Sequence, residues 1–210
     1  MRAQLYNQRH ELIVPETICA DYSFISWYTL AMQLFQAFLH RFDKISTSYL
    51  VWGIVLTGFV VYFRTFFNGF VGDDIGYINH PYIQHFEVLK FFQSSSADLG
   101  GTSPITGQFF RPLMLVLISS IYQISGDHAF LYHLIQLLLH ITNVVLLFFL
   151  FKHFFTRSIS FLLACLYLVH PINVETVAYI SDFQDILFVL FGLLAINLAL
   201  YFPVTKKTLY

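Results

Sequence analysis

The chain has 210 residues, of which 57% are hydrophobic and 11% are charged, whereas a soluble domain carries about 25% charged residues. Such a chain cannot cover its apolar surface with charge, which excludes a soluble globular protein and predicts that lipid surrounds it. The formal net charge of −1 gives no basis for nucleic acid as a partner, since nucleic-acid binding needs a clear excess of positive charge.

Four apolar segments predict membrane-spanning helices, because a spanning helix needs roughly 20 apolar residues. They cover residues 45–63, 129–151, 158–169 and 186–202. The third segment is short and ends at His170-Pro171. Residues 173–185 also have a helical pattern, and we expect them to join the last span in one long helix. The predicted fold class is therefore all-α, a polytopic transmembrane helical bundle of about four spans plus interfacial helices.

Two further apolar segments are predicted to lie at the membrane surface. Residues 24–39 carry a polar stripe at three- and four-residue steps, which is typical of an amphipathic interfacial helix. The stripe consists of Ser26, Thr29, Gln33, Gln36 and His40. A spanning helix is the alternative for this segment. Residues 112–125 are too short to span comfortably, which favours an interfacial or re-entrant helix.

Basic residues near the helix ends predict the orientation of the bundle, because Lys and Arg favour the cytoplasmic side. With four spans, three basic pairs fall on one side, namely Arg41 with Lys44, Lys152 with Arg157, and Lys206 with Lys207. A long external loop over 68–111 falls on the other side. We therefore expect a cytoplasmic tail with an interfacial helix over 1–44, a transmembrane module over 45–203, and a truncated cytoplasmic end over 204–210.

Asp73-Asp74 is the clearest candidate for chemistry. The pair follows the first predicted span in the external loop, and Gly72 and Gly76 flank it. One carboxylate there has the chemistry of a general base toward an acceptor hydroxyl. The two together could instead bind a divalent cation through oxygen ligands. A solvated turn is the structural alternative, since Asp is common in turns.

Arg111, His170 and Glu175 are candidates for binding a phosphate or a hydroxyl group on the same external side. Arg111 precedes Pro112, which suits the first position of a helix, and its guanidinium can bind phosphate in a bidentate manner. The alternative for Arg111 is contact with lipid headgroups. His170 and Glu175 lie at the external mouth of the third span, where a helix stop and a solvated carboxylate are the alternatives.

The second predicted span carries a polar stripe at spacings of three, four and three residues. Its members are His133, Gln136, His140 and Asn143. Polar groups in a membrane helix turn toward neighbouring helices and bond to them, so we interpret the stripe as packing contacts. A proton or ion path is the functional alternative, which a transporter or channel fragment would use.

These motifs, in their order along the chain, resemble the N-terminal part of the GT-C membrane glycosyltransferases. The nearest likeness is to the O-mannosyltransferase-like proteins that carry C-terminal tetratricopeptide repeats, and to their prokaryotic relatives. The resemblance covers roughly residues 67–195. The matching stretches are FVGDDIGYINHPYI, FFRPL, YHLIQLLLHITN and LVHPINVETVAYISDFQDILFVLFGLLA.

The resemblance implies a glycosyltransferase in a prokaryotic membrane, rather than in an endoplasmic reticulum, that moves a sugar from a polyprenyl-phosphate donor to a polypeptide or glycan hydroxyl on the external face. By this likeness Asp73 or Asp74 is the catalytic base, with Asp73 slightly preferred, or both bind a metal ion. Arg111, His170 and Glu175 are candidates for the donor phosphate. The resemblance implies no particular cofactor, and a divalent cation bound by the two aspartates is the candidate.

Two departures from the family pattern support a rival interpretation. Relatives usually carry a basic residue between the Ser and the Asp of the last motif, whereas this chain has Ser181-Asp182-Phe183-Gln184-Asp185. The chain also ends after about four predicted spans, fewer than the seven or more of the family. An inactive fragment or a structural membrane subunit is therefore the alternative to an active enzyme.

Overall fold

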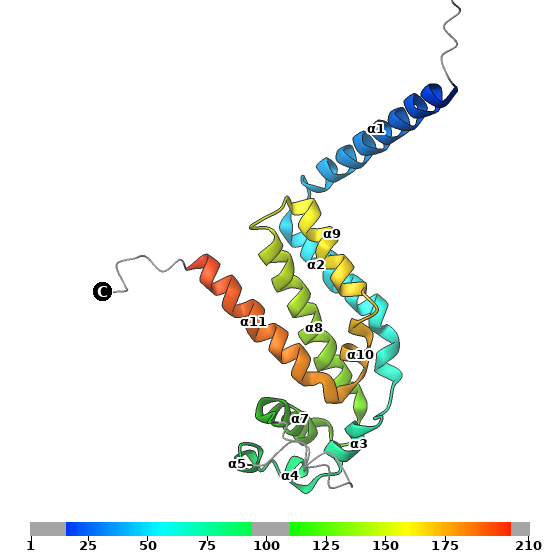
Figure 1. Ribbon diagram of the computed structural model, residues 1–210. Helices are drawn as coiled ribbons and strands as arrows, with labels where there is room; N and C mark the ends of the chain where they lie inside the picture. Colours follow the sequence, from blue (N-terminus) through cyan, green and yellow to red (C-terminus); the bar gives the residue numbers. More distant parts are fainter. Residues whose placement is uncertain (1–15, 94–109, 203–210) are drawn as a thin grey trace, which may run out of the picture. The chain divides into compact units, whose positions relative to one another are not determined.

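The computed structural model describes residues 16–93 and 110–202, with side chains from residue 26 onward. Within these ranges the chain forms α-helices and short 3-10 helices, and no strand. The predicted all-α class is therefore confirmed. The chain divides into two units, 1–44 and 45–210, and each is described by itself (Figure 1).

The first unit contains the helix α1 (Glu16–Phe42), which is 27 residues long. It is longer than the predicted segment 24–39. Large apolar side chains such as Trp27, Leu34 and Phe35 are exposed along it. An exposed apolar surface of this kind suits contact with lipid. That α1 lies on the cytoplasmic face of a membrane stays a prediction.

The second unit has three helices that are long and apolar enough to cross a membrane within the described residues. The first is α2 (Thr47–Tyr62) continued by η1 (Phe63–Phe67). The second is α8 (Ala129–Phe151), with the bounds predicted from the sequence. The third is α11 (Phe183–Tyr201), preceded by η2 (Ile180–Asp182). A helical membrane bundle is the resulting architecture.

The third predicted span is the shorter helix α9 (Arg157–Val169), which has 13 residues. At about 1.5 Å per residue it is roughly 20 Å long, less than the ~30 Å of a bilayer core. The four predicted spans are therefore three long helices and one short one, and the short one is the segment whose apolar run was already short in the sequence. Pro171 follows directly and prevents α9 from continuing, because proline cannot donate the next helical hydrogen bond.

Hydrogen bonds fix the direction of each helix in the bundle. Arg157 donates to the Ile45 carbonyl at 2.6 Å and Tyr62 donates to the Leu168 carbonyl at 2.8 Å, so α2 and α9 run parallel. Lys152, at the end of α8, donates to Thr47 Oγ1 at the start of α2, so α8 runs opposite to them. Lys152 and Arg157 therefore lie at the same end of the bundle, as the orientation argument requires.

The polar stripe of α8 joins it to the last helix. His133, Gln136, His140 and Asn143 are all buried. Asn143 Nδ2 donates to the Ile186 carbonyl at 3.0 Å, and Asn197 Nδ2 donates to the Leu146 carbonyl at 3.3 Å. The Asn143 bond supports the interpretation of the stripe as packing between helices, and the two bonds together show that α8 and α11 run parallel. For His133 and His140 the interpretation stays a prediction.

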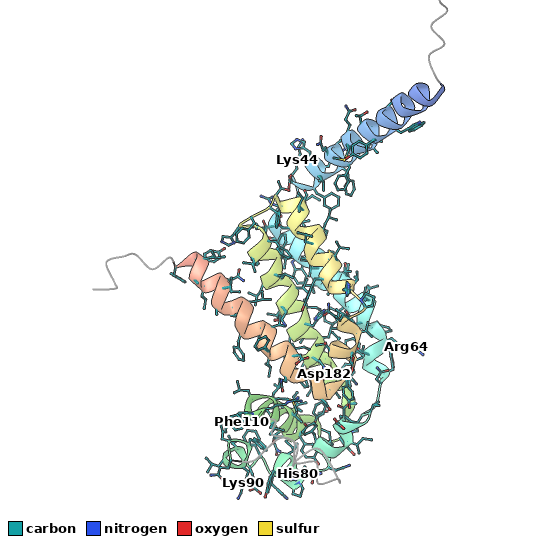
Figure 2. The ribbon with its side chains drawn as sticks, in the orientation of Figure 1. Lys44, Arg64, His80, Lys90, Phe110 and Asp182 are labelled. Carbon is teal, nitrogen blue, oxygen red and sulfur yellow. The ribbon has the colours of Figure 1, made fainter. Side chains whose placement is uncertain are left out.

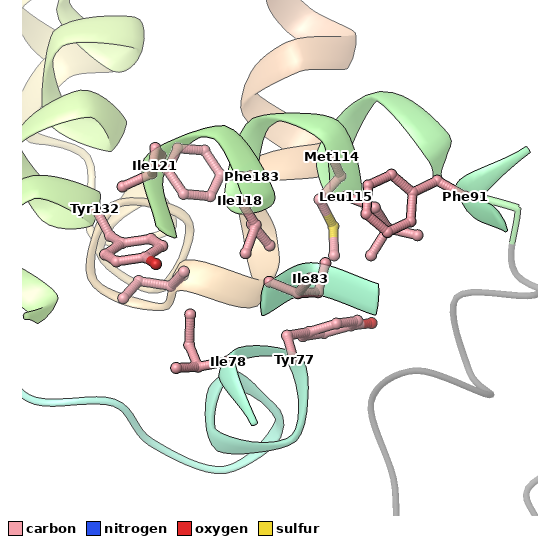
Figure 3. Packing of buried hydrophobic residues seen from close by; sticks show 11 residues of the cluster. Tyr77, Ile78, Ile83, Phe91, Met114, Leu115, Ile118, Ile121, Tyr132 and Phe183 are labelled. Carbon is pink, nitrogen blue, oxygen red and sulfur yellow. The ribbon is translucent and has the colours of Figure 1, made fainter. Parts of the chain in front are cut away.

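The segment between the first two long helices forms a helical layer at the other end of the bundle. It contains α3 (Asp73–Ile78), α4 (Pro81–Gln84), α5 (Val88–Phe91) and α7 (Pro112–Ser125). The predicted loop 68–111 therefore has helices of its own. Figure 3 shows side chains of α7 pointing toward Ile83 of α4. The cluster consists of Tyr77, Ile78, Ile83, Phe91, Met114, Leu115, Ile118, Ile121, Tyr132, Ile180 and Phe183.

The expectation of one long helix from residue 173 into the last span is wrong. The structure has α10 (Asn173–Ala178), a break at Tyr179, then η2 and α11. Tyr179 is extended, with φ −110° and ψ 113°. The Gln136 amide donates to the carbonyls of Thr176 and Tyr179 at 2.8 and 2.6 Å. The buried Gln136 side chain thus supplies hydrogen bonds to backbone carbonyls at the point where the helix is interrupted.

Candidate functional site

The carboxylate of Asp74 is buried, with 1% of the residue exposed. Its Oδ1 accepts from the backbone N–H of Ser181 at 2.7 Å and from the Ser181 hydroxyl at 2.6 Å. Its Oδ2 accepts from the Val71 N–H at 3.2 Å. Both oxygens are therefore engaged, and Asp74 joins the first turn of α3 to the short helix η2.

Asp73, the neighbouring carboxylate, is exposed. Its backbone N–H donates to the Tyr179 hydroxyl at 3.0 Å, while no hydrogen bond joins its carboxylate to another described residue. The turn is thus held at two points, Asp73 N–H to Tyr179 and Asp74 to Ser181. The two points fix the backbone of Asp73 and leave its side chain facing outward.

Gly72 makes this close approach possible. Its φ is +56°, a conformation that side-chain-bearing residues rarely adopt, and a Cβ at this position would lie 2.8 Å from the Tyr179 hydroxyl. The Gly-Asp-Asp sequence therefore fits the contact for a local reason. Gly72 allows the backbone conformation and the close approach of Tyr179. Asp74 holds the turn through Ser181, and the Asp73 side chain is exposed to solvent.

Asp182 is a charged residue of this region that the sequence reasoning did not select as a site residue. It lies at the end of the bundle from which α11 starts (Figure 2). Its carboxyl is within electrostatic range of Asp185, Glu175, Arg111 and Asp74, in decreasing order of effect. The sequence feature that could have drawn attention to Asp182 is its position directly after Ser181, in the motif that lacks the basic residue of the family.

The predicted phosphate-binding residues are brought together in part. Arg111 precedes α7 and Glu175 lies on α10, and both act electrostatically on Asp182. His170 ends α9, is exposed, and its Nδ1 accepts from the Ile172 N–H at 3.2 Å. No described contact joins His170 to Arg111. The phosphate-binding roles of all three residues stay predictions.

The expected metal site has little support in the geometry. The described residues contain no group of three or more His, Cys, Asp or Glu side chains placed to hold a metal ion. In the Asp73-Asp74 turn, Asp74 uses both oxygens for protein hydrogen bonds. Asp73 alone is open to a ligand. These residues do not form a protein cage for a divalent cation, and no step below depends on one.

The chain is similar to protein O-mannosyl-transferase TMTC1. It is 30% identical to the protein of Homo sapiens over 139 residues, which cover 64% of this chain and 16% of the relative. The protein of the same name from Mus musculus is 29% identical over 139 residues, 64% of this chain and 15% of the relative. No protein-family model and no solved structure matches the chain.

This similarity supports one part of the resemblance, the part to O-mannosyltransferase-like proteins. The chain spans about one sixth of the length of these relatives. Both relatives come from mammals, so the comparisons give no support to the expected prokaryotic membrane. An integral membrane location agrees with the three long apolar helices.

Proposed function

We propose that the chain is a GT-C type glycosyltransferase module that moves a sugar from a polyprenyl-phosphate donor to a hydroxyl group on the external or lumenal face. The observation that carries the proposal is the division of roles in the acidic pair. Asp74 is buried and bonded to Ser181, and Asp73 is exposed on the same short turn. A fixed backbone that presents one open carboxylate is what a general base requires.

In the proposed reaction the Asp73 carboxylate accepts the proton of the acceptor hydroxyl. The acceptor oxygen forms a bond to the anomeric carbon of the sugar as the bond from that carbon to the phosphate oxygen breaks. The electron pair of the broken bond stays on the polyprenyl phosphate, which leaves as the anion. Direct displacement of this kind inverts the anomeric centre.

The donor end of the site is assigned to Arg111. A guanidinium binds phosphate oxygens with charge-assisted hydrogen bonds. Arg111 also acts on Asp182, next to the residue that holds Asp74. Glu175 and His170 are further donor-site candidates, and Glu175, like Arg111, acts electrostatically on Asp182.

The relatives are named as O-mannosyl-transferases, so mannose is the first sugar to test. Membranes that contain this chain are incubated with radiolabelled polyprenyl-phosphate mannose, and transfer to protein or glycan is measured. We expect transfer with the native chain and a rate about 10²–10⁴-fold lower with Asp73→Asn. Glu87→Gln is the matched control, because Glu87 is an exposed carboxylate of the same segment outside the turn.

Transfer at the native rate in Asp73→Asn contradicts the assignment of the base. Absence of transfer with the native chain, with every donor sugar tested, contradicts the proposed enzyme and favours the inactive membrane subunit.

A further inference from the structure

An apolar pocket of about 430 Å³ lies between the start of α7 and the first half of α11. Its volume is within the range of small-molecule sites, about 300–1,000 Å³. The pocket is lined by Phe110, Arg111, Pro112, Leu113, Met114, Gln184, Leu187, Phe188, Phe191 and Gly192. Figure 2 shows Phe110 beside the layer that contains α7.

The apolar part of the lining is open to a hydrophobic ligand. Phe188 is 79% exposed and Phe110 is 63% exposed, and Leu113 and Phe191 are exposed as well. Such a concave apolar surface in a membrane protein is suited to a hydrocarbon chain, which gains by contact with these side chains.

The polar part of the lining is confined to one end. Arg111 directly precedes α7, and Gln184 is in the first turn of α11. Gly192 lies eight residues further along α11, about 12 Å away at 1.5 Å per residue. The pocket therefore has a polar end at the start of α11, where Gln184 lies three residues after the Ser181 that bonds Asp74, and an apolar end further along the same helix.

Gln184 adds an independent sign of a polar ligand. Its Oε1 is buried and has no hydrogen-bond partner among the described residues. A buried amide without a partner costs free energy, which a ligand that donates a hydrogen bond would recover. Arg111 is the charged residue among those that line the pocket, and it favours an anionic group at the same end.

We propose that this pocket holds the first isoprene units of the polyprenyl-phosphate donor, with the phosphate at Arg111 and a sugar hydroxyl at Gln184. The proposal rests on the proposed function, and it names the part of the protein that recognises the lipid chain of the donor. A polyprenyl phosphate matches the change from polar to apolar residues along the pocket lining, since it carries one anionic group at the end of a single hydrocarbon chain.

Gly192 allows a test that fills the pocket. A Cβ built there meets no heavy atom within 4 Å, so Gly192→Leu places a side chain in open space. Ile196→Phe is the matched control, because Ile196 is an exposed residue of the same helix outside the pocket lining. Phe188→Ala is a second variant, which removes an exposed side chain of the pocket lining and leaves the buried core unchanged. Circular dichroism checks the helical content of each variant.

The probe is geranylgeranyl phosphate with a photoactivatable diazirine on its chain, added to the protein in phosphatidylcholine nanodiscs. We expect Gly192→Leu and Phe188→Ala to reduce cross-linking about tenfold, and Ile196→Phe to leave it unchanged. Unlabelled geranylgeranyl phosphate competes, and geranylgeraniol, which lacks the phosphate, competes about tenfold less well, the size of one lost charge-assisted contact. Arg111→Gln removes the difference between these two competitors.

Equal cross-linking of the native chain and Gly192→Leu overturns the proposal. Competition by phosphatidylglycerol as strong as that by geranylgeranyl phosphate also overturns it, because the pocket would then be a general lipid contact. Cross-linking that depends on Gly192 and Arg111, in a chain that transfers no sugar, supports the pocket and contradicts the proposed transferase. Sugar transfer that persists with unchanged cross-linking in Gly192→Leu contradicts only the pocket.

Discussion

The Asp74 carboxylate and Ser181 are 107 positions apart in the chain, and they form two hydrogen bonds through one oxygen, at 2.7 and 2.6 Å. This contact holds the turn after the first long helix against the start of the last one. It also determines which of the two adjacent aspartates is open. The first two predictions concern the stability of this contact.

Asp74→Asn is expected to destabilise the fold by about 1–3 kcal/mol, because an amide presents at most one acceptor oxygen and leaves buried donors without a partner. Thermal unfolding in detergent measures the effect. Asp73→Asn is the matched control, since Asp73 is exposed and its backbone contact to Tyr179 does not use the side chain. Equal unfolding temperatures for the two variants would contradict the assigned roles.

Gly72→Ala is expected to destabilise the fold more than Gly126→Ala. Both glycines have positive φ, +56° and +57°, so both variants incur backbone strain of about 1–3 kcal/mol. At Gly72 the new Cβ also meets the Tyr179 hydroxyl at 2.8 Å, whereas nothing lies within 4 Å at Gly126. Adding Tyr179→Phe to Gly72→Ala should recover part of the loss. The same loss at both glycines would show that the approach of Tyr179 is unimportant.

The region around α4 is expected to become less stable as the pH is lowered below about 6.5, the ordinary pKa of histidine. Burial lowers the pKa of His80, and its Nδ1 accepts from the Tyr82 N–H at 3.2 Å. The neutral ring is therefore the form that folding favours. Its contribution is complete above the unfolded pKa and is lost as the pH falls through the folded one.

Unfolding temperatures between pH 7.5 and 5 test this dependence on His80. His80→Asn keeps a helix-capping acceptor and cannot titrate, so it should reduce the slope of stability against pH. His85→Gln removes an imidazole from the same segment and controls for that loss. An unchanged slope in His80→Asn would rule out His80 as the source.

Gln136→Leu is expected to weaken the break between α10 and η2, because the Gln136 amide donates to the carbonyls of Thr176 and Tyr179. Hydrogen bonds between membrane helices contribute about 0.6–2 kcal/mol each. Amide hydrogen exchange of residues 179–182 should become faster. Thr142→Val is the control on the same helix, since Thr142 is exposed and bonds only to the Leu138 carbonyl. Equal exchange in both variants would contradict the role of Gln136.

The local features of the fold were predictable from the length of the apolar segments and from the helix-ending residues that follow them. The bounds of α8 follow from its predominantly apolar composition over 129–151, and Pro171 marks the end of α9. The break at Tyr179 was not predicted, because the pattern of residues 173–185 indicates a helix and the Gln136 amide that bonds to the Tyr179 carbonyl lies 43 positions earlier in the chain. No local pattern shows a tertiary contact of this kind.

The candidate site was predictable in its residues and not in its geometry. The acidic pair stands out in the sequence, but two adjacent aspartates look alike until the partner of Asp74 is known. Ser181 is far away along the chain, so no local pattern separates the buried carboxylate from the exposed one. Asp182 was overlooked for a similar reason, since apart from Asp185 on α11 its charged neighbours come from distant parts of the chain: Asp74 of α3, Arg111 before α7 and Glu175 of α10.

The most direct test of the central claim is the single-turnover rate of sugar transfer in Asp73→Asn, measured together with donor binding on the same preparation. Loss of a general base lowers such a rate by about 10²–10⁴-fold. We predict a loss of this size with donor binding unchanged, because Asp73 acts on the acceptor. A rate in Asp73→Asn equal to that of the native chain would contradict the account.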